Sequence, residues 1–204
     1  MKIAYFCCSV DHLPLGEISA ASARACMPDA EIIHLTDRDT PALQGADRVI
    51  RLDLSGSFWR RLWLASSHLD GEVIHANTDI VFLQDVSNVF SLEGFDIAVP
   101  HIADPRWRYD AGLLFSRSRD FCRALADSEA SMTDDLDAWL ATYRQVVDQF
   151  AHVTLPGYFY SHVPLSDKVS DERIKVMHFR GPRKAWMLEG WTPAPEAERW
   201  MPKR

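Results

Sequence analysis

Short apolar runs alternate with helix-like segments over the first half of this 204-residue chain. Four runs have the length and apolar content of buried strands: residues 2–9, 30–37, 47–54 and 72–82. Two segments between them, residues 16–27 and 57–69, have helical spacing. This alternation predicts an α/β domain in which helices cover the faces of a mostly parallel central sheet.

The second half is less regular. Strands are expected at residues 95–100, 111–117 and 174–179, the last within "IKVMHF". A helical pattern runs from Arg119 to about Gln149, where Thr133 is a candidate helix cap. We expect the tail after residue 179 to be loop with short helical pieces.

Composition excludes several classes of protein. The net charge is −7 and no Lys/Arg run exceeds two residues, so wholesale binding to nucleic acid is not favoured. No apolar run approaches the roughly 20 residues of a membrane span, and the N-terminus turns polar too early for a signal peptide. The four cysteines lack metal-type spacing, which favours reduced thiols and a cytoplasmic location.

The strand predicted at residues 72–82 is interrupted by Asn77, Thr78 and Asp79. Polar atoms inside a core strand cost free energy unless they are paired. In open α/β sheets, ligands bind outside the carboxyl ends of the strands. The triplet is therefore expected to end the strand and face a ligand, with a structural turn as the alternative.

A second polar stretch, "HFRGPRKAW", follows the late strand and contains His178, Gly181 and Lys184. Histidine binds transition metals, glycine admits a ligand close to the backbone, and lysine is a point charge suited to phosphate. Together with Asp79 these residues describe a metal–diphosphate site, although a lone histidine at a strand end is more often structural.

Two further charged residues are candidates. In "WRYDAGLLFSRS", Asp110 stands at the entry to a strand with a glycine behind it, and a simple turn is the alternative. Arg61 lies in a predicted helix sixteen residues before Asn77, where a solvated helix arginine is the alternative.

These stretches together resemble the retaining glycosyltransferases that include glycogenin and the bacterial lipopolysaccharide galactosyl- and glucosyltransferases. "VIHANTDIVFLQDVSNVF" is similar to their strand with an Asp-x-Asp motif, and "HFRGPRKAW" to their C-terminal motif. "YDAGLLFSRS" and "YFCCSVDHLPLGEISAASARAC" resemble two further family segments. The resemblance implies a single nucleotide-diphospho-sugar transferase domain with a Rossmann-like, A-type fold. Residues 1–118 would form the nucleotide-sugar half, and residues 119–204 the acceptor side and C-terminal motif.

The resemblance also implies a nucleotide-diphosphate-sugar donor, usually UDP-linked, and a divalent cation, Mn²⁺ or Mg²⁺. Asp79 and His178 take the positions of metal ligands, and Asn77 takes the first acidic position. The remaining donor contacts would come from Arg61, from Gly181, Lys184 and Trp186, and from the loop containing Cys8, Ser9 and Asp11.

Transfer would proceed with retention to a saccharide or other hydroxyl acceptor. Asp110 stands where the family has an Asn that reaches the donor sugar. Asp134 and Asp135 resemble an acidic acceptor-side motif, with Leu136 where Gln is usual. With Lys184, these three aspartates are the predicted catalytic residues.

Some residues depart from the family pattern. Asn77 carries no charge, and charge count contributes to affinity for hard divalent ions, so metal binding should weaken. This departure keeps open the alternative of a decayed, non-enzymatic nucleotide-sugar-binding module. A nucleotidyltransferase is a third possibility, but the N-terminal loop lacks the glycine-rich basic sequence that it would need.

The metal-ligand hypothesis predicts that Asp79→Ala abolishes nearly all metal-dependent donor hydrolysis. Asn77→Asp should keep the fold and tighten Mn²⁺, because it adds a charge beside the cation. Mn²⁺ titrations of both variants and of the wild type would measure these effects. If Asp79 only stabilises a turn, Asp79→Ala would instead lower the melting temperature and leave activity per folded molecule intact.

Overall fold

The computed structural model describes residues 1–53, 55–102, 108–164 and 171–190. Its main sheet has seven strands in the order β3-β2-β1-β4-β7-β6-β8. The strands are β1 (Lys2–Phe6), β2 (Glu31–Thr36), β3 (Arg48–Arg51), β4 (Val73–Ala76), β6 (Ile97–His101), β7 (Leu113–Ser116) and β8 (His152–Pro156). All neighbours pair in parallel except β7, which is antiparallel to both β4 and β6. The predicted α/β class with a mostly parallel sheet is confirmed.

The strand predicted at residues 72–82 is in fact two strands that belong to different sheets. After β4, residues 77–79 leave the main sheet, and β5 (Ile80–Phe82) pairs with β9 (Val176–His178) in a two-stranded antiparallel sheet. The expectation that the polar triplet ends the strand is confirmed, because β4 ends at Ala76. The pairing of residues 80–82 in a different sheet was not predicted, because both halves are apolar and buried. The sequence pattern does not show that they have different partners. Strand β8 was not predicted, since only one of its five residues is buried and it lacks the apolar pattern of a core strand.

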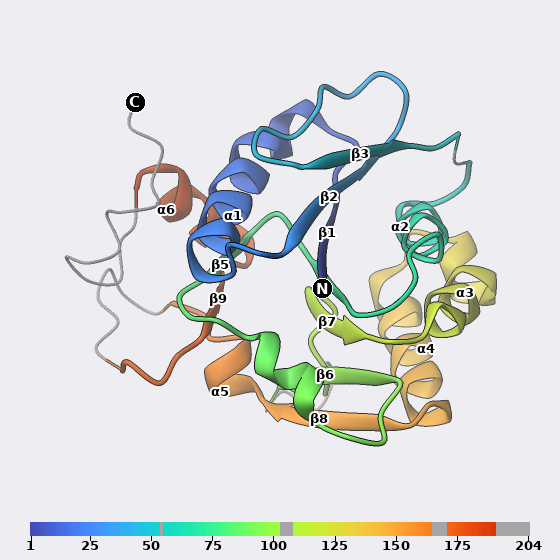
Figure 1. Cartoon of the computed structure of the whole chain (residues 1–204). Coiled ribbons are helices and arrows are strands. Elements are labelled where there is room, and N and C mark those ends of the chain that lie inside the picture. Colours follow the sequence, from blue (N-terminus) through green and yellow to red (C-terminus); the bar gives the residue numbers. More distant parts are fainter. Residues whose placement is uncertain (54, 103–107, 165–170, 191–204) are drawn as a thin grey trace.

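Six α-helices are described: α1 (Leu13–Cys26), α2 (Phe58–Ser66), α3 (Arg119–Asp127), α4 (Leu136–Gln149), α5 (Gly157–Tyr160) and α6 (Lys184–Leu188). Short 3-10 turns lie at η1 (Val10–His12), η2 (Ser87–Ser91), η3 (Glu129–Met132) and η4 (Gly181–Arg183). Figure 1 shows α2, α3 and α4 on one side of the main sheet, and α1, α6 and the small sheet on the other. None of the described helices is both long enough and apolar enough to cross a membrane.

The helical pattern predicted from Arg119 to about Gln149 is broken between α3 and α4. Asp135, rather than Thr133, caps α4, and its side chain accepts a hydrogen bond from the Ala138 amide at 3.0 Å. The Thr133 hydroxyl instead accepts from the Asp135 amide at 3.4 Å. Asp and Thr can both cap a helix, so sequence alone did not distinguish them.

The central strand β1 contributes to a hydrophobic core on each face of the sheet. Ile3 and Tyr5 face α1, and the Tyr5 hydroxyl accepts a hydrogen bond from Ser19 of that helix at 3.0 Å. Ala4 and Phe6 pack on the opposite side with Ala65 of α2. Because β1 and β4 are parallel neighbours, the loops that follow them emerge at the same edge of the sheet.

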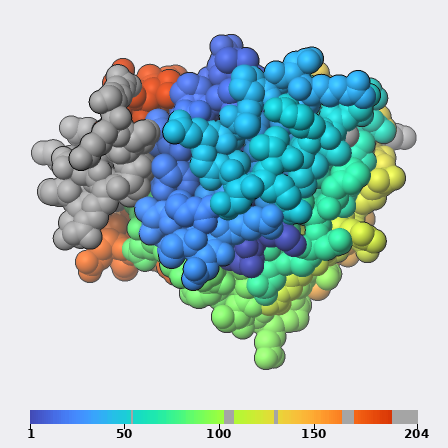
Figure 2. All heavy atoms as spheres, turned by 45° about the horizontal axis from the view of Figure 1, so that its top comes forward, coloured from blue at the N-terminus to red at the C-terminus, as the bar shows by residue number. Residues whose placement is uncertain are grey.

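The N-terminal part of the chain covers much of one face of the molecule. Figure 2 shows it in blue and cyan, with orange-red atoms of the last described segment beside the blue atoms at the upper left. The first and last described segments are therefore neighbours on this surface, although most of the sequence separates them. This arrangement allows residues near both ends of the chain to share one site.

Gly157 is expected to be indispensable to the fold. A Cβ at this position would lie 1.8 Å from the carbonyl oxygen of His101, so α5 and β6 can approach only without a side chain. Gly157→Ala should lower the free energy of unfolding by about 2 kcal/mol or more in urea denaturation. Gly45→Ala is the control: its Cβ would meet nothing within 4 Å, and its positive φ should cost only about 1 kcal/mol. Equal losses for the two variants would contradict this explanation.

Candidate functional site

A pocket of about 220 Å³ opens at the carboxyl ends of β1 and β4. Its walls come from the loops after these two strands, from one face of α2 and from the start of α6. The lining residues are Phe6, Cys7, Cys8, Ser9, His12, Phe58, Arg61, Asn77, Thr78, Asp79 and Lys184. Six of them were predicted from the sequence as site residues: Cys8, Ser9, Arg61, Asn77, Asp79 and Lys184.

Pairing of β5 with β9 brings Asp79 and His178 together. Ile80 lies opposite His178 in the register, and the Phe179 amide donates to the Asp79 carbonyl at 2.8 Å. One carboxylate oxygen of Asp79 lies 3.4 Å from His178 Nε2, and the other lies 3.2 Å from Lys184 Nζ. Asp79 therefore contacts two other predicted residues, of which Lys184 lines the pocket and His178 does not.

Asp110 lies on the far side of the His178 ring. Its carboxylate is 2.9 Å from His178 Nδ1 and 2.9 Å from a terminal nitrogen of Arg180. It also accepts hydrogen bonds from the Gly112 amide, at 2.8 Å, and from the Ser161 hydroxyl. The side chain is almost fully buried, so all these contacts are internal. Asp110 is thus placed to orient His178 and does not line the pocket.

The charges of this cluster shift its pKa values. Burial alone would lower the pKa of His178, but the charges and hydrogen bonds of Asp110 and Asp79 outweigh burial and raise it to about 9. Burial would raise the pKa of Asp110, yet His178, Arg180 and Ser161 hold it well below its ordinary value. For Asp79, the favourable contacts with His178 and Lys184 likewise exceed the effect of burial and lower the pKa. Both carboxylates are therefore ionised at neutral pH.

Gly112 makes the close packing around His178 possible. A Cβ at this position would lie 2.3 Å from His178 Cε1 and 3.1 Å from Asn77 Nδ2. The Gly112 carbonyl also accepts a hydrogen bond from the backbone amide of Asn77 at 2.8 Å, and this bond fixes the end of β4. This glycine therefore allows the imidazole, the end of β4 and the start of β7 to meet.

Arg61 and Lys184 supply positive charge to the pocket from two different helices. Arg61 is half-buried, and its buried Nε has no hydrogen-bond partner within the described part of the chain. A buried donor without a partner is costly, so such a group marks a place where a ligand can be bound. The ligand that best satisfies a guanidinium is an anion such as phosphate.

The donor atoms also allow a test of whether a divalent metal fits. Two ligands in adjacent positions of an octahedral ion, each about 2.1 Å from it, are about 3 Å apart. The 3.4 Å between Asp79 Oδ1 and His178 Nε2 is close to this separation. Metal-binding histidines usually donate a hydrogen bond from their other ring nitrogen to a carboxylate. Asp110 provides that carboxylate here, next to Nδ1 of His178. Asp79 and His178 therefore fit a metal that displaces the proton from Nε2 of His178.

The number of protein ligands that a metal could find here is nevertheless small. Asp110 contacts the opposite ring nitrogen, so it cannot converge on the same ion as Asp79. No group of three His, Cys, Asp or Glu side chains in the described ranges is arranged as a metal site. Asn77 lines the pocket and offers one more oxygen, without charge. A metal here would need further oxygen ligands from a bound molecule, as phosphates can supply.

Other predicted residues lie apart from this cluster. Gly181 begins η4 and has a positive φ of 60°. The residues Gly181, Trp186 and Asp11 are all exposed. Asp134 accepts a hydrogen bond from the Phe58 amide at 3.0 Å, and Asp135 caps α4. Their carboxylates thus have structural partners at helix starts, and their predicted catalytic role remains a prediction.

Several residues that contribute to the site were not predicted from the sequence. Phe58, His12 and Thr78 line the pocket, while Arg180 and Ser161 hold Asp110. Arg180 could have been noticed, because it stands between His178 and Gly181 in the C-terminal motif. Ser161 gave no signal, since only tertiary structure brings it to Asp110.

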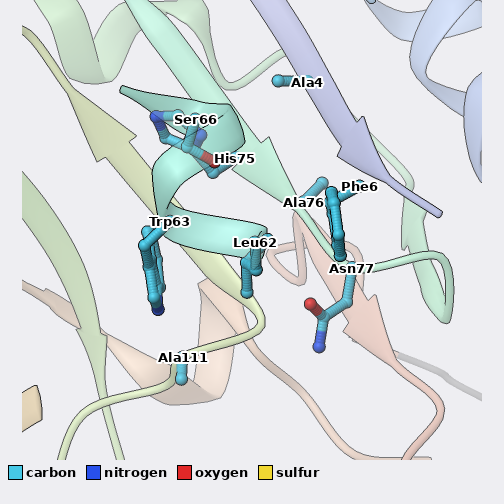
Figure 3. Close-up of a pocket in the computed structure, with 9 residues that line it drawn as sticks. All are labelled: Ala4, Phe6, Leu62, Trp63, Ser66, His75, Ala76, Asn77 and Ala111. Carbon is cyan, nitrogen blue, oxygen red and sulfur yellow. The ribbon is translucent and has the colours of Figure 1, made fainter. Parts of the chain in front are cut away.

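A second cavity lies behind the pocket, between α2 and β4 (Figure 3). Phe6 and Asn77 line both cavities. The second cavity has a volume of only about 10 Å³, which is about the space that one water molecule occupies. It is too small for a sugar or a nucleotide, so the larger pocket is the candidate ligand site.

Comparisons with known proteins identify the fold. No family model matches the chain, and no curated protein matches it. Among solved structures, the glycosyltransferase GlyE of Streptococcus pneumoniae TIGR4 is similar with a TM-score of 0.67 and 14% identity. The match covers 98% of this chain and 58% of GlyE, so the chain spans little more than half of that protein.

Two other glycosyltransferases are similar over nearly their whole length. The galactosyltransferase LgtC, solved with donor and acceptor sugar analogues, has a TM-score of 0.58 and 14% identity, covering 98% of this chain and 99% of LgtC. An enzyme involved in glycosylating the major capsid of PBCV-1 has a TM-score of 0.62 and 10% identity, covering 92% and 96%. The chain therefore has the A-type glycosyltransferase fold, which confirms the resemblance at the level of the fold.

Asp110→Asn is expected to destabilise the protein by about 3–5 kcal/mol, because it leaves the buried charge of His178 and the partly buried charge of Arg180 without their carboxylate. Urea unfolding of the two proteins at pH 7 would measure the loss. Asp127→Asn is the control: its exposed ion pair with Arg123 should contribute almost nothing. A loss for Asp110→Asn no larger than that of the control would contradict the role assigned to this carboxylate.

Proposed function

We propose that this protein is a hexosyltransferase that moves a sugar from a nucleotide diphosphate to an acceptor hydroxyl. The supporting observation is that Asp79, His178, Lys184 and Arg61 gather around one pocket at the strand ends of a glycosyltransferase fold. The proposed donor is a UDP-sugar, and the proposed cofactor is Mn²⁺ or Mg²⁺. The acceptor is a saccharide or another hydroxyl compound.

The charges at the site suit a diphosphate. Lys184 is half-buried and its ammonium is held in place by Asp79 at 3.2 Å, so it can contact a phosphate at little entropic cost. Arg61 adds a guanidinium with an unsatisfied nitrogen. Two cations on the wall of a partly apolar pocket interact with an anion more strongly than they would in water.

Cleavage of the sugar–phosphate bond increases the negative charge on the departing diphosphate. Lys184 and Arg61 stabilise that charge, and this effect is larger in the transition state than in the ground state. Asp79 and His178 would hold the divalent cation, with Asn77 as a neutral third ligand. When bound, the cation supplies Lewis-acid stabilisation worth several kcal/mol to the leaving group.

The carboxylates of the cluster are poorly placed to act as covalent nucleophiles. Asp110 is buried behind His178, and both oxygens of Asp79 are engaged by His178 and Lys184. We therefore favour attack by the acceptor hydroxyl on the face from which the diphosphate leaves, so that a diphosphate oxygen accepts the hydroxyl proton. This course retains the anomeric configuration.

Calorimetry with UDP-sugars in the presence and absence of Mn²⁺ tests the donor. Binding should be measurable at sub-millimolar concentration and should tighten with Mn²⁺, because the ion neutralises phosphate beside Asp79. Hydrolysis of the bound donor, followed by NMR, should release a sugar of retained configuration. Absence of any nucleotide-sugar binding at millimolar concentration would refute the proposal.

Two other outcomes would distinguish a retaining transferase from its alternatives. Tight binding without any turnover, even with a panel of saccharide acceptors, would identify a non-enzymatic binding module instead. Release of a sugar of inverted configuration would rule out the retaining course. For substitutions of Lys184, Arg183→Ala is a suitable control. Arg183 belongs to the same C-terminal motif, but it donates a hydrogen bond to the Pro164 carbonyl at 2.7 Å and does not line the pocket.

A further inference from the structure

Phe58 is an aromatic residue that the fold keeps at the pocket without burying it. Its side chain is 41% exposed, whereas the neighbouring Phe6 is buried. Phe58 and Arg61 are three residues apart on α2 and therefore share the helix face that lines the pocket. An exposed large apolar side chain at a binding pocket is a place where a ligand can cover apolar area.

The ring is held in place from several directions. The Phe58 amide donates to the Asp134 carboxylate at 3.0 Å, and Ser57, the cap of α2, donates its hydroxyl to the Ser131 carbonyl. The next residue, Trp59, stacks on Trp139 of α4 with ring centroids 4.1 Å apart. Phe58 itself meets Phe6 edge to face at 5.7 Å. Phe58 also meets Trp59 edge to face at 5.0 Å, and with these contacts in place it is still 41% exposed.

We propose that Phe58 is the stacking platform for the nucleobase of the donor, an inference that rests on the proposed function. The diphosphate end of the pocket is defined by Asp79 and Lys184, which are in contact with each other. Phe58 comes from a different element, the start of α2, next to the loop of Cys8 and Ser9. A flat, apolar ring fits the planar π-face of a base, and every base presents such a face.

This assignment gives Phe58 a role different from that of Arg61 on the same helix. Arg61 provides charge for the phosphates, whereas Phe58 provides apolar contact without charge. Removal of the ring should therefore weaken ligands that contain a base and leave ligands that consist only of phosphate unchanged. The two effects can be separated because pyrophosphate has no base.

The experiment measures binding of UDP, a UDP-sugar, GDP, ADP, TDP and pyrophosphate, each with Mn²⁺, by calorimetry. Phe58→Ala should weaken the nucleotide that the wild type binds best by about fivefold or more, and pyrophosphate by less than twofold. Phe58→Leu, which keeps apolar bulk without a ring, should also weaken it, and Phe58→Trp should preserve binding. Leu92→Ala is the matched control, because Leu92 is also 41% exposed and does not line the pocket.

Each other outcome overturns the inference in a distinct way. Equal loss of nucleotide and pyrophosphate binding would mean that Phe58 only supports the phosphate site. Loss confined to the UDP-sugar, with UDP unaffected, would place the ring against the sugar. Unchanged nucleotide binding in Phe58→Ala would refute a role for the ring while the proposed function stands. Failure of the wild type to bind any nucleotide would refute both.

Discussion

The imidazole of His178, held between the carboxylates of Asp110 and Asp79, is the interaction on which the rest of the site depends. It joins three segments that are distant in sequence: the end of β4, the start of β7 and the end of β9. Burial of these charges is costly, and it is offset because Lys184 contacts the second oxygen of Asp79, while Arg180 contacts the same Asp110 oxygen as His178. The row of charges thus fixes both the position of the small sheet and the direction of the imidazole.

The pocket has a local charge opposite to that of the whole protein. The chain carries a net charge of −7, yet the residues that face the pocket include Arg61 and Lys184. The carboxylate of Asp110 lies behind the ring, and the neutral Asn77 takes the more exposed place. Asp79 is the one carboxylate among the described pocket-lining residues, and its charge is offset there by the contact with Lys184. The net negative charge of the whole chain disfavours non-specific binding of anions such as nucleic acid.

Much of the site could be predicted from sequence because it follows one rule of α/β folds, that ligands bind at the carboxyl ends of strands. That rule, together with the C-terminal motif, brought Asp79, His178 and Lys184 to one place. The roles of Asp110 and Ser161 could not be predicted, because they depend on which side of a buried ring each group reaches. Phe58 was missed for a similar reason, because an aromatic residue at a helix start is usually part of the core. Only the packing of Trp59 on Trp139 shows why Phe58 stays outside the core.

The division of residues 72–82 between two sheets has a consequence for how the protein is made. Five strands of the main sheet, β1 to β4 and β7, pair entirely within the first 116 residues. The partner of β5 is synthesised much later, because it ends at His178. A nascent chain can therefore assemble most of its central sheet on the ribosome while Asp79 still lacks its imidazole and its lysine. The site is complete only after β9 has been synthesised and has paired with β5.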